Sequence, residues 1–91
     1  MTNQEEIYRG EEAKRLIEHP LFKDALDSVR AGLVGAMGSS GMGDTETHNR
    51  LVIALQLLNQ IEKSIKTHVE TGQLAEISVR ESMANRLKRV F

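Results

Sequence analysis

Six side chains in the second half of the chain recur at steps of three and four residues, and this spacing constrains the fold more than any other feature. The six are Leu51, Ala54, Leu58, Ile61, Ile65 and His68. Such spacing places side chains on one face of an α-helix. Asp44 or Thr45 is suited to cap the start of this helix, and Gly72 is typical of a helix end. The pattern predicts a long helix over residues 45–71.

A second stripe of the same kind begins after the only proline. Proline disfavours a helical conformation of the residue before it and is well placed as the first residue of a helix, so we expect a new helix at Pro20. Its apolar positions are Phe22, Leu26, Val29, Leu33 and Met37. The glycine-rich residues 38–44 have the composition of a flexible linker. Helices over 20–37 and 45–71 joined by this linker make an antiparallel helical hairpin.

Short helices are expected on either side of the hairpin. A charged segment over residues 4–18 has loose helical periodicity and should end before Pro20. After Gly72, residues 78–90 form a second short segment, which is rich in basic side chains. No residue pattern of a strand accompanies these helices. We therefore expect an all-α protein in which residues 1–91 form a single domain.

The long helix has more apolar surface than one partner helix can cover. Val52, Ile53, Leu55 and Leu57 lie beside the main stripe, and a chain of 91 residues without cysteine has neither disulfides nor most zinc sites to stabilise it. We therefore expect a homo-oligomeric bundle or ring, with a monomeric bundle of three or four helices as the alternative. The predicted oligomer interface consists of Leu51, Leu55, Leu58, Ile61 and Ile65.

The charge balance singles out the end of the chain. The net charge is only −1, which excludes a uniformly basic nucleic-acid coat. Four basic side chains nevertheless gather near the carboxyl end and are the predicted contacts with nucleic acid or a partner protein: Arg80, Arg86, Lys88 and Arg89. A solvated helix is the simpler interpretation of this segment. No stretch has the length of a membrane span, and the acidic amino end is unlike a secretory signal, so we expect a cytoplasmic protein.

The sequence offers no pattern typical of an enzyme. A catalytic site needs a nucleophile with a base, a carboxylate pair in a cleft, or a metal or cofactor. The histidines His19, His48 and His68 are too far apart in sequence for a recognisable metal-ligand motif. We therefore predict no catalytic residues, no cofactor and no metal.

Two segments resemble a family of small helical proteins found in tailed phages and prophages. Residues 9–22 read RGEEAKRLIEHPLF and residues 71–75 read TGQLA, which are similar to the opening and the ending of those proteins. The glycine-rich linker and the basic extension after Ala75 depart from the family pattern. The resemblance implies a phage origin and a place among proteins of DNA packaging and head assembly. In outline the hairpin is also similar to the oligomerisation core of small terminase subunits.

Three functions follow as hypotheses, and the third is a structural adaptor of the virion, which would be recognised by its presence in purified particles. The leading one is a non-enzymatic phage protein for DNA packaging or head assembly, a small terminase-like oligomer that contacts viral DNA and a packaging motor ATPase. The alternative is a phage-encoded inhibitor or sequestering protein that acts on a host defence protein or a signalling nucleotide. In that case binding would use a pocket between subunits, with Tyr8, Arg9 and Lys14 as candidate contacts. Either of the first two proteins would act in the cytoplasm of the host cell.

Overall fold

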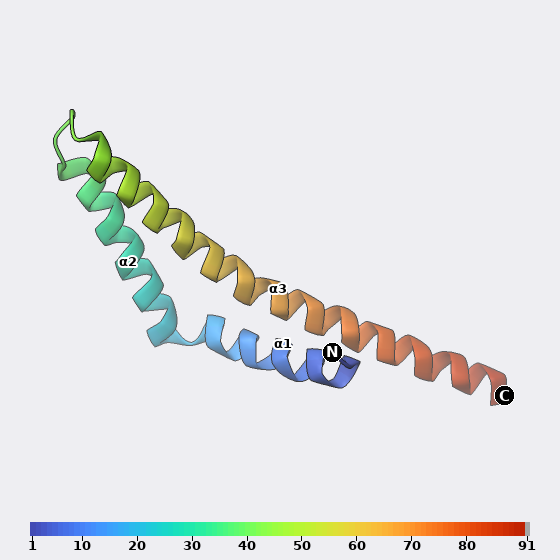
Figure 1. Ribbon diagram of the computed structural model, residues 1–91. Helices are drawn as coiled ribbons and strands as arrows, with labels where there is room; N and C mark the ends of the chain where they lie inside the picture. Colours follow the sequence, from blue (N-terminus) through green and yellow to red (C-terminus); the bar gives the residue numbers. More distant parts are fainter. Residues whose placement is uncertain (91) are drawn as a thin grey trace. The chain divides into compact units, whose positions relative to one another are not determined.

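Three α-helices account for nearly all of the computed structural model, which describes residues 1–90 and the side chains of residues 1–89. They are α1 (Asn3–Glu18), α2 (Pro20–Ser39) and α3 (Thr45–Val90), shown in Figure 1. No strand occurs in this part of the chain. The predicted all-α class is therefore confirmed, and Phe91, the last residue of the predicted single domain, lies outside the described residues.

Local capping explains where the helices begin. The hydroxyl of Thr2 accepts a hydrogen bond from the backbone N–H of Glu5 at 3.2 Å, and His19 Nδ1 accepts one from Leu21 N–H at 3.2 Å. Asp44 caps α3, because its Oδ1 accepts a hydrogen bond from the N–H of Thr47 at 3.1 Å. α2 thus begins at Pro20, the residue at which the sequence predicts it to begin.

The helix end predicted at Gly72 is wrong. α3 runs without interruption for 46 residues, from Thr45 to Val90, so the predicted helices over 45–71 and 78–90 are parts of one helix. Gly72 has no positive φ, and it therefore lacks the left-handed conformation that would end a helix. Because it has no side chain, Gly72 instead allows α3 to cross another helix at close range.

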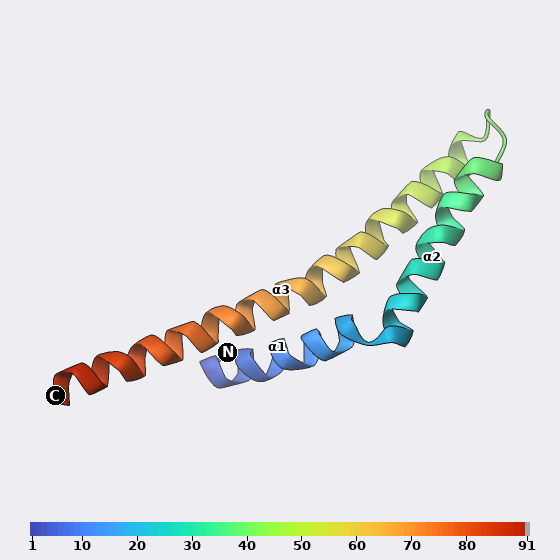
Figure 2. The same ribbon diagram turned by 180° about the vertical axis from the view of Figure 1, so that it is seen from behind.

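The chain divides into two compact units. In the first, α1 up to Leu16 packs on α3 from Ile65 onward, and in the second, α2 packs on residues 45–64 of α3. The helices of each pair run in opposite directions and lie side by side in both views of the ribbon (Figures 1 and 2). The buried apolar residues are Ala13 and Ala75 in the first unit and Leu58 in the second. Both cores are small.

Candidate functional site

Two glycines allow α1 and α3 to touch through their backbones. A Cβ atom added to Gly10 would lie 2.8 Å from the Cα of Gly72 and 2.9 Å from the carbonyl oxygen of His68. A Cβ added to Gly72 would lie 2.9 Å from the Cα of Gly10. Contacts this short leave no room for any side chain at either position. Gly10 and Gly72 therefore fix the crossing of the first unit.

A cavity of about 250 Å³ lies beside this crossing. The residues that line it are Ile7, Gly10, Glu11, Lys14, Val69, Gly72, Gln73 and Glu76. Its polar side chains include one cation, Lys14, together with the carboxylates of Glu11 and Glu76. Lys14 forms no ion pair within residues 1–89. Its ammonium group is available to a ligand that enters the cavity.

A second cavity of about 350 Å³ lies on the same pair of helices. Arg9, Glu12, Ala13, Leu16, Ile65 and His68 line it. Arg9, like Lys14, has no ion-pair partner among the described side chains. The cavity combines this guanidinium with the carboxylate of Glu12 and an apolar wall, and the guanidinium suits a ligand that combines an anionic group with a planar or apolar part.

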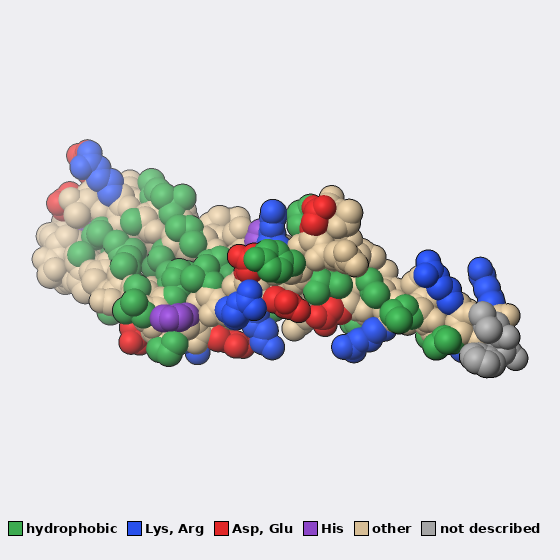
Figure 3. Space-filling view, turned by 90° about the horizontal axis from the view of Figure 1, so that it is seen from below, with side chains coloured by type: hydrophobic (Ala, Val, Ile, Leu, Met, Phe, Trp, Pro, Cys, Tyr) green, Lys and Arg blue, Asp and Glu red, His purple; other side chains and the backbone are tan. Residues whose placement is uncertain are grey.

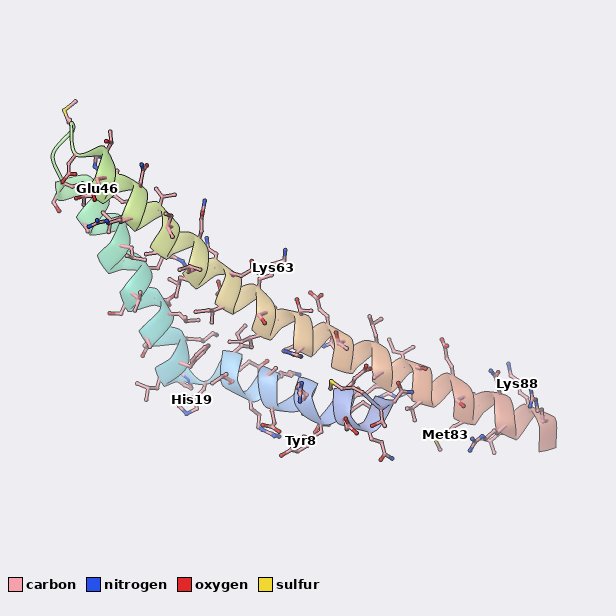
Figure 4. All side chains as sticks on the ribbon, in the orientation of Figure 1. Tyr8, His19, Glu46, Lys63, Met83 and Lys88 are labelled. Carbon is pink, nitrogen blue, oxygen red and sulfur yellow. The ribbon has the colours of Figure 1, made fainter. Side chains whose placement is uncertain are left out.

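Tyr8, the third candidate contact of the sequestering hypothesis, lines neither cavity. Its side chain is 62% exposed and points away from α3 (Figure 4). A hydrogen bond to the carboxylate of Glu12, and then the negative charge of that group, raise the pKa of the Tyr8 phenol above its ordinary value. Tyr8 remains a candidate only for a ligand that reaches the outer side of α1.

The predicted interface residues on α3 lie mainly inside the two units. Leu58 is buried, and Leu51, Leu55 and Ile65 are half-buried. Ile61 alone among the five is exposed, at 54%. Four of the five side chains thus pack at least partly within their own chain, and Ile61 is the one whose side chain is largely exposed.

Arg30 takes a position that sequence reasoning assigned to Val29. Arg30 is half-buried against α3, where its Nη2 donates hydrogen bonds to Glu62 Oε2 at 2.9 Å and Asn59 Oδ1 at 3.3 Å. Val29 is 52% exposed. The signal was present in the sequence, because Arg30 follows Leu26 by four residues and precedes Leu33 by three, which is the same spacing as the apolar stripe.

The predicted basic contacts lie on the last part of α3. Arg80, Arg86, Lys88 and Arg89 are all exposed. At about 100° per residue, they lie near 0°, 240°, 80° and 180° around the helix axis. Lys88 points to a different side of α3 from the apolar side chain of Met83 (Figure 4). The four cations surround the helix rather than forming one cationic face.

Within the described residues, no three histidine or acidic side chains come together as metal ligands would. No helix among residues 1–90 is both long and apolar enough to cross a bilayer.

Comparison of the chain with models of known protein families, with curated proteins and with solved structures gives no match.

Proposed function

We propose that the protein is a non-enzymatic, phage-encoded binding protein that sequesters a small anionic ligand, of which a signalling nucleotide is the leading example, in the host cytoplasm. The observation that carries this proposal is the position of Arg9 and Lys14. Each cation lines a cavity beside the crossing of α1 and α3, and neither is used in an ion pair within the described part of the chain. The likeness to small phage proteins supports the phage origin.

Self-association is part of this proposal. Protein pockets that hold small molecules usually measure about 300–1,000 Å³ and cover most of the ligand. The cavity beside Lys14 is smaller, at about 250 Å³, the cavity beside Arg9 is near the lower limit, at about 350 Å³, and both open to solvent. A second copy placed over them would supply the missing walls. We therefore propose that the antiparallel hairpins of several copies assemble, and that a ligand binds where copies meet.

The test is calorimetric titration of the wild-type protein with nucleoside monophosphates, nucleoside triphosphates and cyclic nucleotides. Arg9→Gln removes a charged donor from one cavity and Lys14→Gln removes one from the other, so we expect the variant of the occupied cavity to weaken binding about 10- to 100-fold. Lys88→Gln removes an exposed cation of α3 that lies outside both cavities, and it should leave binding unchanged. The proposal fails if none of these nucleotides binds, or if both cavity variants bind like the wild type.

DNA packaging is the second candidate, and the exposed basic end of α3 favours it. Every residue from Arg80 to Arg89 is exposed, so four cations are free to contact phosphates or a motor ATPase. In a small terminase-like ring these ends would repeat around the assembly. Their spread around the helix limits one copy to a few simultaneous phosphate contacts.

A salt titration of DNA binding tests this second candidate. With up to four phosphate contacts per copy, the logarithm of the binding constant should fall with the logarithm of salt concentration at a slope of about −3 to −4 per copy. Deletion of residues 80–91 should abolish binding. Undetectable affinity for DNA at low salt would remove the packaging function and leave the sequestering function standing.

A further inference from the structure

The second unit has one polar side, and Arg30 marks it. At about 100° per residue, Val29 and Arg30 flank the half-buried stripe of α2 from opposite sides. On α3, Asn59 and Ile61 flank the buried Leu58 in the same way. Because Arg30 donates a hydrogen bond to Asn59, these two residues belong to the same side of the helix pair. Val29 and Ile61 must then share the other side.

That other side carries small and apolar residues from both helices. Helical spacing places six residues there, which we call the Val29 face: Ala25, Val29, Gly32, Ala36, Leu57 and Ile61. Leu57 and Ile61 are 61% and 54% exposed. In the space-filling view, hydrophobic side chains gather over the part of the chain formed by α2 and the beginning of α3 (Figure 3). Ala36 is half-buried and the other five residues are exposed, so the chain itself leaves most of this face uncovered.

The accessible surface of the chain is larger than that of a typical folded monomer of its mass. The chain exposes 7161 Å², whereas a typical folded monomer of 10.2 kDa exposes about 5,300 Å². The excess of about 1,800 Å² exceeds the roughly 800 Å² that each partner buries in a protein–protein interface of standard size. This surplus belongs to the whole chain, including the exposed residues 80–89 of α3, and it is large enough for at least one contact with another copy.

We propose that the Val29 face binds the same face of a second copy and forms a four-helix bundle from two α2–α3 pairs. The proposal rests on the self-association put forward above. It adds a contact between the α2–α3 units of two copies to the one that covers the cavities of the α1–α3 unit. It assigns the contact to the side of the helices that carries Val29 and Leu57. Most of the interface residues predicted from sequence are instead partly or fully buried by the chain's own helices.

The chemistry of the Val29 face suits a symmetric contact. None of its six residues is charged, so two identical faces meet without repulsion. Arg50 lies at its edge and is paired with Glu46 at 2.6 Å. A Cβ added to Gly32 would meet no atom within 4 Å, so this glycine, which costs helix stability, has no packing role within its own chain. Next to a second copy it would let the helices approach closely.

Two matched pairs of substitutions test the assignment. Val29→Glu and Leu57→Glu place a carboxylate on the proposed contact, and Val34→Glu and Val52→Glu place one on the polar side. Val29 and Val34 are especially well matched, because they lie on the same helix and are 52% and 54% exposed. The measurement is the mass of the full chain by sedimentation and light scattering across a dilution series, with helix content followed by circular dichroism.

We expect the wild-type protein to have at least twice the mass of one 10.2 kDa chain. Val29→Glu and Leu57→Glu should raise the dissociation constant at least about 100-fold, because each would bury an unpaired charge, whereas the two controls should change it less than about threefold. If the glutamate variants lose helix content, Val29→Cys and Val34→Cys test the contact instead. The thiol of Val29→Cys should react with a maleimide at least about tenfold more slowly than the thiol of Val34→Cys, because a second copy covers only position 29.

Each contrary outcome has its own meaning. A wild-type protein that is monomeric at 100 µM overturns both this contact and the self-association on which it rests, and it leaves the Val29 face to a different partner. A wild-type oligomer that Val29→Glu and Leu57→Glu leave intact, or equal labelling of the two cysteines, overturns the Val29 face alone. In that second case oligomerisation and ligand sequestration would still stand.

Discussion

The glycine crossing of α1 and α3 gives the sharpest test of the packing described above. Gly10→Ala adds a single carbon where the nearest backbone atoms lie 2.8 and 2.9 Å away. Carbon atoms in favourable contact sit about 3.5–4.0 Å apart. Both obstructing atoms belong to the backbone of α3, so no rotation of a side chain relieves the clash. α1 has to move away from α3 by roughly 0.7–1 Å to accommodate the methyl group.

Two opposing effects set the size of the change. Overpacking of this kind usually costs about 1–3 kcal/mol, and replacing a helical glycine with alanine returns up to about 1 kcal/mol. We therefore expect Gly10→Ala to lower the free energy of unfolding by about 1–2 kcal/mol. For a chain of this length, the midpoint of thermal unfolding should fall by roughly 5–15 °C.

Thermal unfolding followed by circular dichroism at 222 nm, at one fixed protein concentration, measures this change. Gly35→Ala is the matched control, because a Cβ at Gly35 meets no atom within 4 Å, and it should raise the midpoint by a few degrees. In the double variant Gly10→Ala/Gly72→Ala the loss should be smaller than the sum of the two single losses, since the first methyl already separates the helices. A Gly10→Ala protein as stable as the wild type would refute the close crossing.

Two further predictions concern polar contacts. Arg30→Met removes the hydrogen bonds to Glu62 and Asn59, and it should lower the free energy of unfolding in urea by about 0.5–1.5 kcal/mol. Arg50→Met breaks only an exposed pair with Glu46 and should lower it by less than about 0.5 kcal/mol. Equal losses in the two variants would contradict the role of Arg30. Hydrogen bonds from Thr47 lower the pKa of Asp44. This carboxylate therefore stabilises the fold at pH values above its ordinary pKa, and the contribution is lost as the pH falls through the lowered value. Asp44→Asn should make unfolding less dependent on pH between 5 and 2, and an unchanged profile would contradict the assignment.

Local rules in the sequence were enough to place several helix boundaries. Pro20 fixes the start of α2 because its ring suits the first turn of a helix and disfavours helix in the residue before it. Asp44 caps α3 because a short side-chain acceptor reaches the free N–H of Thr47. Both signals depend on atoms a few residues apart, so neither needs knowledge of the tertiary fold.

Gly72 shows where local rules fail. A glycine after an apolar stripe is typical of a helix end, and nothing nearby in sequence argues otherwise. The residue that decides its role is Gly10, which lies 62 positions earlier and packs against it. The clue was present in the spacing, since Ile65, Val69 and Gly72 continue the steps of four and three, and the buried Ala75 extends them. The contact with Gly10, however, could not be predicted from a single sequence.

The same limit applies to the predicted oligomer interface, and it changes how that prediction is to be used. Sequence periodicity identifies which α3 residues are apolar, but it does not say which of them the chain covers by itself. Leu58 satisfies the pattern and is buried by the chain's own helices, whereas Leu57, one residue earlier, is 61% exposed. Adjacent helical residues point about 100° apart, so a one-residue difference separates a core position from an exposed one. A substitution at Leu58 therefore tests folding, whereas one at Leu57 tests the proposed contact with a second copy.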